Sequence, residues 1–85
     1  MIYFIQEQGS KRIKIGSSAN CVSRLGTLQT GSPEELRLVL TIEGDAITER
    51  QLHKRFAHLR VRGEWFKGGP ELLGFIQAAV PIQDY

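Results

Sequence analysis

Alternating and branched apolar residues in the first half of the chain predict three strands. Residues 2–7 begin with an apolar, β-rich run, and residues 11–17 alternate basic with apolar positions, as expected of a strand with one buried face. The polar segment Gln8-Gly9-Ser10 between them predicts a hairpin turn. The run from Leu36 to Ile42 predicts a third strand that pairs with this hairpin.

Three helices are predicted from capping residues and from apolar positions that recur every three or four residues. Asn20 is expected to cap a helix that ends at Gly31, and Asp45 a second helix over about residues 46–59. Pro70 suits the first position of a third helix, with Pro81 and a polar tail ending the chain. The positions expected to face the core are Cys21, Val22, Leu25, Leu28, Leu52, Phe56, Leu59, Leu72, Leu73, Ile76, Ala79 and Val80.

Length and composition predict one small globular domain over residues 1–85. Hydrophobic residues make up 41% and charged residues 24%, and no apolar run is long enough to span a bilayer, so no membrane contact is expected. The chain starts directly with a strand-like run, which leaves no room for a signal peptide, so we expect a cytoplasmic protein. Its one cysteine, Cys21, cannot form an intramolecular disulfide and is expected to be a buried apolar residue.

The stretch from Lys14 to Leu25 organises our interpretation of the chain. A strand ends at Gly16, a short polar turn leads to the capping Asn20, and Arg24 follows one turn into the helix. A cation is thereby held on a rigid element, although a solvated surface arginine would give the same pattern. The hairpin register is not readable from the sequence, so Tyr3 is expected across from Lys14 or near it.

Two polar residues continue the apolar face of the second predicted helix. Glu49 and His53 precede Phe56 by seven and three residues, which places them near the row that the helix buries. Because an unpaired carboxylate is costly to bury, Glu49 should meet a cation, a metal ion or the water of a cleft. The alternatives are an exposed Glu49 paired with Arg50 or Lys54, and a hydrogen-bonded His53 at the edge of the core.

Charge is unevenly distributed along a chain whose formal net charge is only +2. A basic stretch from residue 50 to residue 67 contains one acid, Glu64, and could follow a phosphate backbone or form a solvated surface. Trp65 and Phe66 lie in the same stretch and favour core packing over base stacking, because so small a domain needs its aromatic residues inside. The basic residues of the stretch are Arg50, Lys54, Arg55, Arg60, Arg62 and Lys67.

Five short motifs in a fixed order give the chain a resemblance to a known superfamily. After Ile2-Tyr3-Phe4 come K-I-G, R-L-x-x-L-Q-T, S-P-x-x-L, E-x-x-L-H-x-x-F and G-E-W-F. This order resembles the compact branch of the GIY-YIG nuclease superfamily, over residues 2 to about 66. The motifs correspond here to Lys14–Gly16, Arg24–Thr30, Ser32–Leu36, Glu49–Phe56 and Gly63–Phe66.

The resemblance implies a small α/β (α+β) fold, with a three-stranded antiparallel sheet flanked by about three helices. It also implies metal-dependent hydrolysis of nucleic-acid phosphodiesters, with DNA as the expected partner and one Mg²⁺ or Mn²⁺ ion as the cofactor. Carried over by position, Tyr3 and Arg24 are catalytic, Glu49 binds the metal, and Gly16 and Asn20 shape the strand end and the turn. Lys14 departs from the pattern, because it replaces the tyrosine of Y-I-G.

Residue chemistry is compatible with such a reaction. Arg24 offers a planar fork for phosphate, and Glu49 offers the hard oxygen that Mg²⁺ prefers. Lys14 could lower the pKa of the Tyr3 phenol, and His53 could position a water or contact phosphate. Glu64 could approach the metal, but pairing with Arg60 or Arg62 is the preferred interpretation. Nucleic-acid contacts are expected from Lys54, Arg55, Arg60 and Arg62.

Three functions remain open from the sequence. The leading hypothesis is an endonuclease, and the first alternative is a nucleic-acid-binding module that has lost turnover through Lys14. The second is a protein-interaction domain in which these residues only stabilise the fold. We expect no separate recognition domain in a chain of this length, so target specificity is expected to come from a partner or from homo-oligomerisation.

Overall fold

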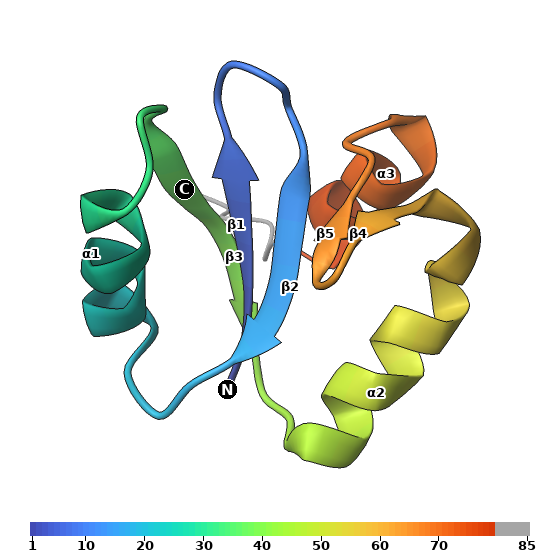
Figure 1. The fold of residues 1–85 in the computed structure, drawn as a ribbon. Helices are drawn as coiled ribbons and strands as arrows, with labels where there is room; N and C mark the ends of the chain where they lie inside the picture. The colour runs from blue at the N-terminus through green and yellow to red at the C-terminus, as the bar shows by residue number, and fades with distance from the viewer. Residues whose placement is uncertain (80–85) are drawn as a thin grey trace, which may run out of the picture.

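The structure is a computed structural model that describes residues 1–79. Val80, expected on the third helix, and the polar tail after it lie outside the described residues. Figure 1 shows the arrangement of the elements. In chain order they are β1 (Ile2–Glu7), β2 (Ile13–Ser17), α1 (Cys21–Thr30), β3 (Leu36–Ile42), α2 (Ala46–Arg55), a 3₁₀ turn (Ala57–Leu59), β4 (Arg60–Arg62), β5 (Trp65–Phe66) and α3 (Pro70–Ala79).

The sheet has five antiparallel strands in the order β3-β1-β2-β5-β4. The expected three-stranded sheet is therefore wrong, although the α+β class holds. Strands β4 and β5 contain three and two residues, too few to show the alternation that marks a strand in sequence. They are held by backbone hydrogen bonds: Ile15 donates to the Glu64 carbonyl at 3.0 Å, and Lys67 donates to the Leu59 carbonyl at 2.8 Å.

The β1–β2 hairpin has a register that the sequence pattern leaves open. Tyr3 pairs with Gly16, and Lys14 pairs with Ile5, one step further along the same face. Strand β2 begins at Ile13 and not at residue 11, because Lys11 has a left-handed φ of 66° and belongs to the turn.

Each face of the sheet carries its own apolar cluster. Alternate residues of β1 divide between them, with Phe4 in the cluster packed by α2 and α3, and Tyr3 in the cluster packed by α1. Trp65 and Phe66 divide in the same way: Phe66 is fully buried on the α2–α3 face, and Trp65 lies partly buried on the α1 face. The prediction that both aromatics pack in a core is thus confirmed for Phe66 and holds only in part for Trp65.

The helix starts follow the predicted caps. The Asn20 side chain accepts a hydrogen bond from the Ser23 N–H at 3.0 Å, and Asp45 caps α2 in the same manner. Helix α2 ends at Arg55 and continues as a separate 3₁₀ turn, so the predicted helix to residue 59 is too long. Val22, expected in the core, is 72% exposed, because α1 contacts the sheet through other residues. No helix of the described chain has the length and apolar character needed to cross a membrane.

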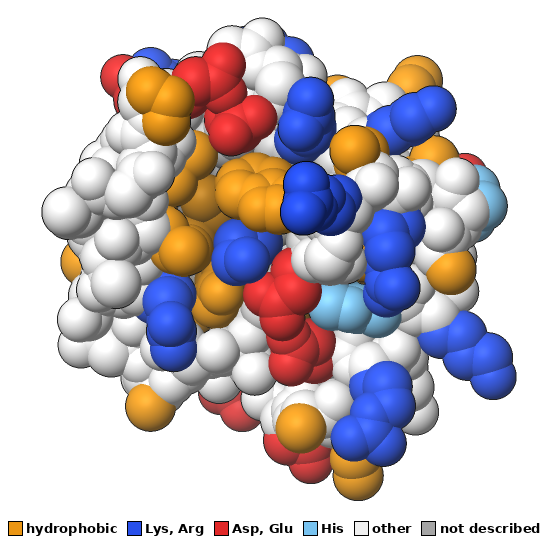
Figure 2. Space-filling model, viewed as in Figure 1, with side chains coloured by type: hydrophobic (Ala, Val, Ile, Leu, Met, Phe, Trp, Pro, Cys, Tyr) orange, Lys and Arg blue, Asp and Glu red, His pale blue; other side chains and the backbone are white. Residues whose placement is uncertain are grey.

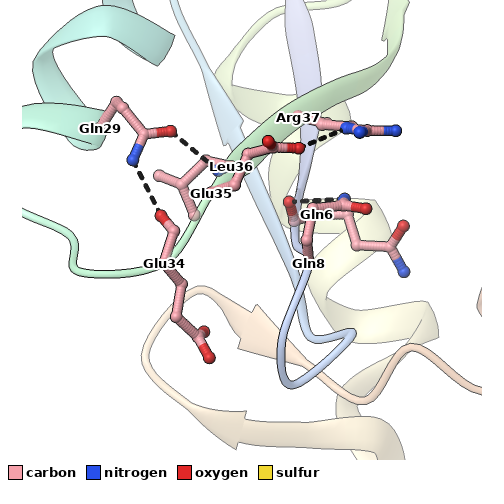
Figure 3. A network of polar contacts seen from close by, with 7 residues as sticks. All are labelled: Gln6, Gln8, Gln29, Glu34, Glu35, Leu36 and Arg37. Carbon is pink, nitrogen blue, oxygen red and sulfur yellow. Dashed lines mark hydrogen bonds and ion pairs between the residues drawn. The ribbon is translucent and has the colours of Figure 1, made fainter.

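Gln29 fastens the end of α1 to the start of β3 (Figure 3). Its amide nitrogen donates to the Glu34 carbonyl at 2.8 Å, and its amide oxygen accepts from the Leu36 N–H at 2.8 Å. These two bonds satisfy backbone groups where the chain turns into the sheet. The glutamine of the R-L-x-x-L-Q-T motif therefore has a structural role, which fixes the helix that carries Arg24.

Candidate functional site

Helix α1 covers only part of one face of the sheet and leaves β2, β5 and β4 uncovered on that face. Helix α1 packs on β3 and β1 (Figure 1). Lys14 pairs with Trp65, and Trp65 pairs with Arg62, so these three side chains share the α1 face of the sheet. Here they are called the open row. The candidate site lies along this row and at its junction with α2.

Tyr3 lies directly over Gly16 at one end of this region. Its side chain is 3% exposed, and a Cβ atom at position 16 would overlap its hydroxyl oxygen and the ring carbon bonded to it. The glycine of K-I-G is therefore required by the close approach of the phenol across the hairpin. Gly16 fixes where the Tyr3 hydroxyl can lie.

We expect Gly16→Ala to displace the Tyr3 hydroxyl and to lower any activity that depends on it. The obstructing atoms belong to the end of a side chain, so the ring can move without unfolding the hairpin. Gly26→Ala is the matched control, because a Cβ there meets no atom within 4 Å and alanine favours a helix. Cleavage rates and thermal unfolding should be measured for both variants. Equal rates in the two variants would contradict a role for the Tyr3 position.

Glu49, His53 and Glu64 form a cluster beside Tyr3, where α2 meets the sheet. Ligand atoms from the three residues lie within 4.8 Å of one another. The cluster lines a cavity of about 260 Å³ together with Ala46 and Arg50. Figure 2 shows an acidic patch beside a histidine in the middle of this face, with lysine and arginine side chains around it.

Strand β2 anchors two members of this cluster. The Ser17 hydroxyl donates to Glu49 Oε2 at 3.0 Å, and the Ile15 carbonyl lies 2.8 Å from His53 Nε2. A carbonyl oxygen can only accept, so Nε2 carries a proton and donates it to Ile15. The side chains of Glu49 and His53 are each 16% exposed, which gives solvent access without burial in the core.

Glu49 pairs with neither Arg50 nor Lys54 among the described residues, so the simple surface alternative does not apply. It hydrogen-bonds Ser17 and lies 4.0 Å from His53 Nε2. Its row on the helix was predicted, but the Ser17 contact was not. The only sequence signal for it is that Ser17 follows Gly16 at the end of the strand.

Lys14 forms an ion pair with Glu64, at 3.2 Å between Nζ and Oε1. The expectation that Glu64 pairs with Arg60 or Arg62 is wrong, because the turn between β4 and β5 directs the carboxylate back over β2. The Lys14 ammonium also lies 5.5 Å from the centre of the Trp65 ring. Lys14 is a member of the open row, and it thus contacts both Glu64 of the acidic cluster and Trp65 of the row.

The pKa of Tyr3 is raised above its ordinary value of 10.0, mainly by burial and next by the negative charge of Glu64. Arg24 acts in the opposite direction, and Glu49 adds to the increase. The expected lowering by Lys14 is wrong: Lys14 is not among the groups that shift the pKa of Tyr3, and its ammonium is paired with Glu64. A raised pKa keeps the phenol protonated at neutral pH, so Tyr3 enters the site as a hydrogen-bond donor.

Arg24 lies in the first turn of α1, and its side chain is exposed. Its backbone N–H donates to Asn20, the N-cap, at 3.0 Å. It also borders a hollow formed by the β2–α1 turn and the start of the helix. Its positive charge favours the ionised form of Tyr3 and so opposes the rise in the pKa of that phenol.

The predicted nucleic-acid-binding residues do not form one surface. Arg62 lies in the open row, whereas Arg60 lies over Phe66 on the opposite face, 5.7 Å from the ring centre. Arg55 lies over aromatic rings of the α2–α3 cluster, and Lys54 is exposed on α2. Of this set, only Arg62 lies beside the site. Arg50, which was not among the predicted contacts, lines the cavity of the acidic cluster.

Comparison with protein-family models matches residues 1–77 to the T5orf172 domain. This domain has a nuclease-like fold related to that of the GIY-YIG enzymes, and the family is compatible with action on nucleic acid. Comparisons with curated proteins and with solved structures each gave no match.

Proposed function

Because the chain belongs to the T5orf172 domain family, we propose that it is a metal-dependent endonuclease that hydrolyses phosphodiester bonds of nucleic acid, with DNA as the preferred substrate. One observation carries the proposal. Glu49, His53 and Glu64 form one cluster beside the end of the β1–β2 hairpin where Tyr3 lies over Gly16, and the charges of Glu64, Arg24 and Glu49 all act on the Tyr3 phenol. A phosphate-binding cation and hard oxygen donors for a metal ion favour this hydrolysis, and a phenol can donate a proton to the leaving oxygen.

The acidic cluster suits a hard divalent cation such as Mg²⁺ or Mn²⁺. Glu49 and Glu64 supply carboxylate oxygens, and His53 supplies a ring nitrogen that lies within 4.8 Å of them. Ser17 orients Glu49, as a hydrogen-bond partner behind a metal ligand commonly does. When bound, the ion would neutralise phosphate charge and lower the pKa of a bound water.

Arg24 is assigned to the phosphate itself. Its guanidinium can donate two parallel hydrogen bonds to phosphate oxygens, and an exposed position leaves it free to do so. The cap at Asn20 and the Gln29 contacts hold both ends of α1, so the helix presents Arg24 in a fixed position. This arrangement stabilises charge that builds up on the phosphate during the reaction.

Tyr3 and Lys14 have separate roles in this proposal. The protonated Tyr3 phenol donates a hydrogen bond or a proton toward the reacting phosphate from its fixed place over Gly16. Lys14 is a positioning residue, because its ion pair holds Glu64 near Glu49 and His53. The lysine therefore does not substitute chemically for the second tyrosine of the superfamily pattern.

The Lys14–Glu64 ion pair also favours a second candidate function, that of a nucleic-acid-binding module without turnover. A lysine that occupies Glu64 competes with a cation for the same carboxylate. Purified protein should be incubated with supercoiled plasmid in Mg²⁺, Mn²⁺ or EDTA. We expect nicking with a metal and none in EDTA. Absence of nicking with either metal, together with retarded migration of the DNA, would favour the binding module.

A further inference from the structure

A groove on the α1 face continues from the open row of the sheet. It has a volume of about 440 Å³ and lies between the C-terminal end of α1 and the strands β5 and β4. Figure 2 shows hydrophobic side chains recessed on this face, between α1 at the left and the charged centre. Apolar atoms of Leu28, Pro33, Leu36 and Trp65 line it, and Arg12 and Arg62 also contribute.

The Trp65 ring forms part of this groove and remains partly exposed. Lys14 lies on one side of it, at 5.5 Å from the ring centre, and Arg62 is its partner in β4 on the other. An indole with cations beside it can stack on a flat heterocycle whose neighbouring groups are anionic. Nucleobases joined by phosphates have this chemistry.

The charge of the groove supports the same ligand. Arg12 and Arg62 line the groove with two positive charges against one negative charge from Glu7, whose carboxylate accepts a hydrogen bond from the Ser10 hydroxyl and is hydrogen-bonded to the Glu34 carboxyl. The groove also adjoins the candidate active site, because Lys14 contacts both Trp65 and Glu64. A nucleic-acid strand that is cleaved near Glu64 would therefore pass this groove. The part of the strand in the groove would lie a short distance from the reacting phosphate.

We propose that the groove holds one unstacked nucleobase of the substrate, which lies against Trp65 while Arg12 and Arg62 contact the adjoining phosphates. The inference rests on the proposed nucleic-acid substrate and specifies it further. A base inside a regular duplex is paired and stacked, so it cannot enter the groove without an added cost. The domain therefore prefers single-stranded or locally unpaired nucleic acid over continuous duplex.

Trp65 provides a direct readout because it is the one tryptophan in the chain. Its fluorescence should be followed during titration with a ten-nucleotide thymidine oligomer, in EDTA so that no cleavage occurs. We expect quenching by this oligomer, weaker quenching when its central nucleotides are abasic, and weaker quenching by a blunt duplex of the same length. Equal quenching by all three probes would overturn the inference.

Variants separate stacking from charge. Trp65→Leu should weaken binding of the thymidine oligomer about tenfold in fluorescence anisotropy and should abolish the difference between the intact and abasic oligomers. Arg62→Gln removes one charge from the exposed edge strand and should weaken binding without removing that difference. Arg37→Gln, which makes the same charge change on β3, is the control. Circular dichroism should verify that each variant is folded.

The inference and the proposed endonuclease activity can fail separately. Quenching of Trp65 by the intact oligomer without plasmid nicking would support the groove and oppose the nuclease. Nicking by a Trp65→Leu variant that still distinguishes intact from abasic oligomers would support the nuclease and overturn the groove. Failure of wild-type protein to bind either oligomer would overturn the groove as well.

Discussion

Replacing Glu49 by glutamine is expected to reduce metal-dependent cleavage by a factor of about 10³, with little loss of folded stability. Glutamine keeps the length of the side chain and can still accept the Ser17 hydrogen bond, but it lacks the charge that a divalent ion requires. The side chain lies at the edge of α2 and not in either apolar cluster. Single-turnover nicking rates and thermal unfolding would test the two parts of this expectation.

Glu43→Gln is the matched control for this variant, because it removes one exposed carboxylate just after β3. Its cleavage rate should equal that of the wild type. Full activity of Glu49→Gln would move the metal site away from Glu49, with Glu64 as the next carboxylate to replace. Retained oligonucleotide binding by an inactive Glu49→Gln protein would place the defect in the chemical step.

Arg24→Ala is expected to lower cleavage by a factor of about 10² to 10³, because charge developing on the phosphate loses its fixed cation. Arg24 is exposed, so its truncation should scarcely change the unfolding temperature. The rate should be compared with that of Arg24→Lys, which retains the charge but not the planar pair of donors. A near-native rate in Arg24→Lys would contradict a bidentate contact with phosphate.

The larger elements of the fold could be predicted because their signals are local. An apolar β-rich run located β1, alternation located β3, and side-chain caps located the starts of α1 and α2. The short strands β4 and β5 could not be predicted, because they exist only through pairing with β2 and with each other. Tertiary contacts, and not residue preference, determine such short strands.

The residues of the candidate site could be proposed from the sequence, but their arrangement in space could not. Helical spacing placed Glu49 and His53 on one face, yet it could not show that β2 supplies a hydrogen-bond partner to each. The partner of Lys14 was also not readable, because it depends on a turn between two strands that the pattern did not reveal. Contacts between segments distant in sequence require the register of the sheet.

Strand β4 ends the sheet on the side of the open row, and its composition affects how copies of the chain meet. It has three residues, all exposed, and two of them are arginines. A short edge strand with like charges is a poor template for a strand from a second molecule, because both copies would bring the same charges together. Arg62, which we assign to nucleic acid, thereby also discourages edge-to-edge aggregation at this border. Arg62→Gln should be examined for reduced solubility as well as for weaker binding.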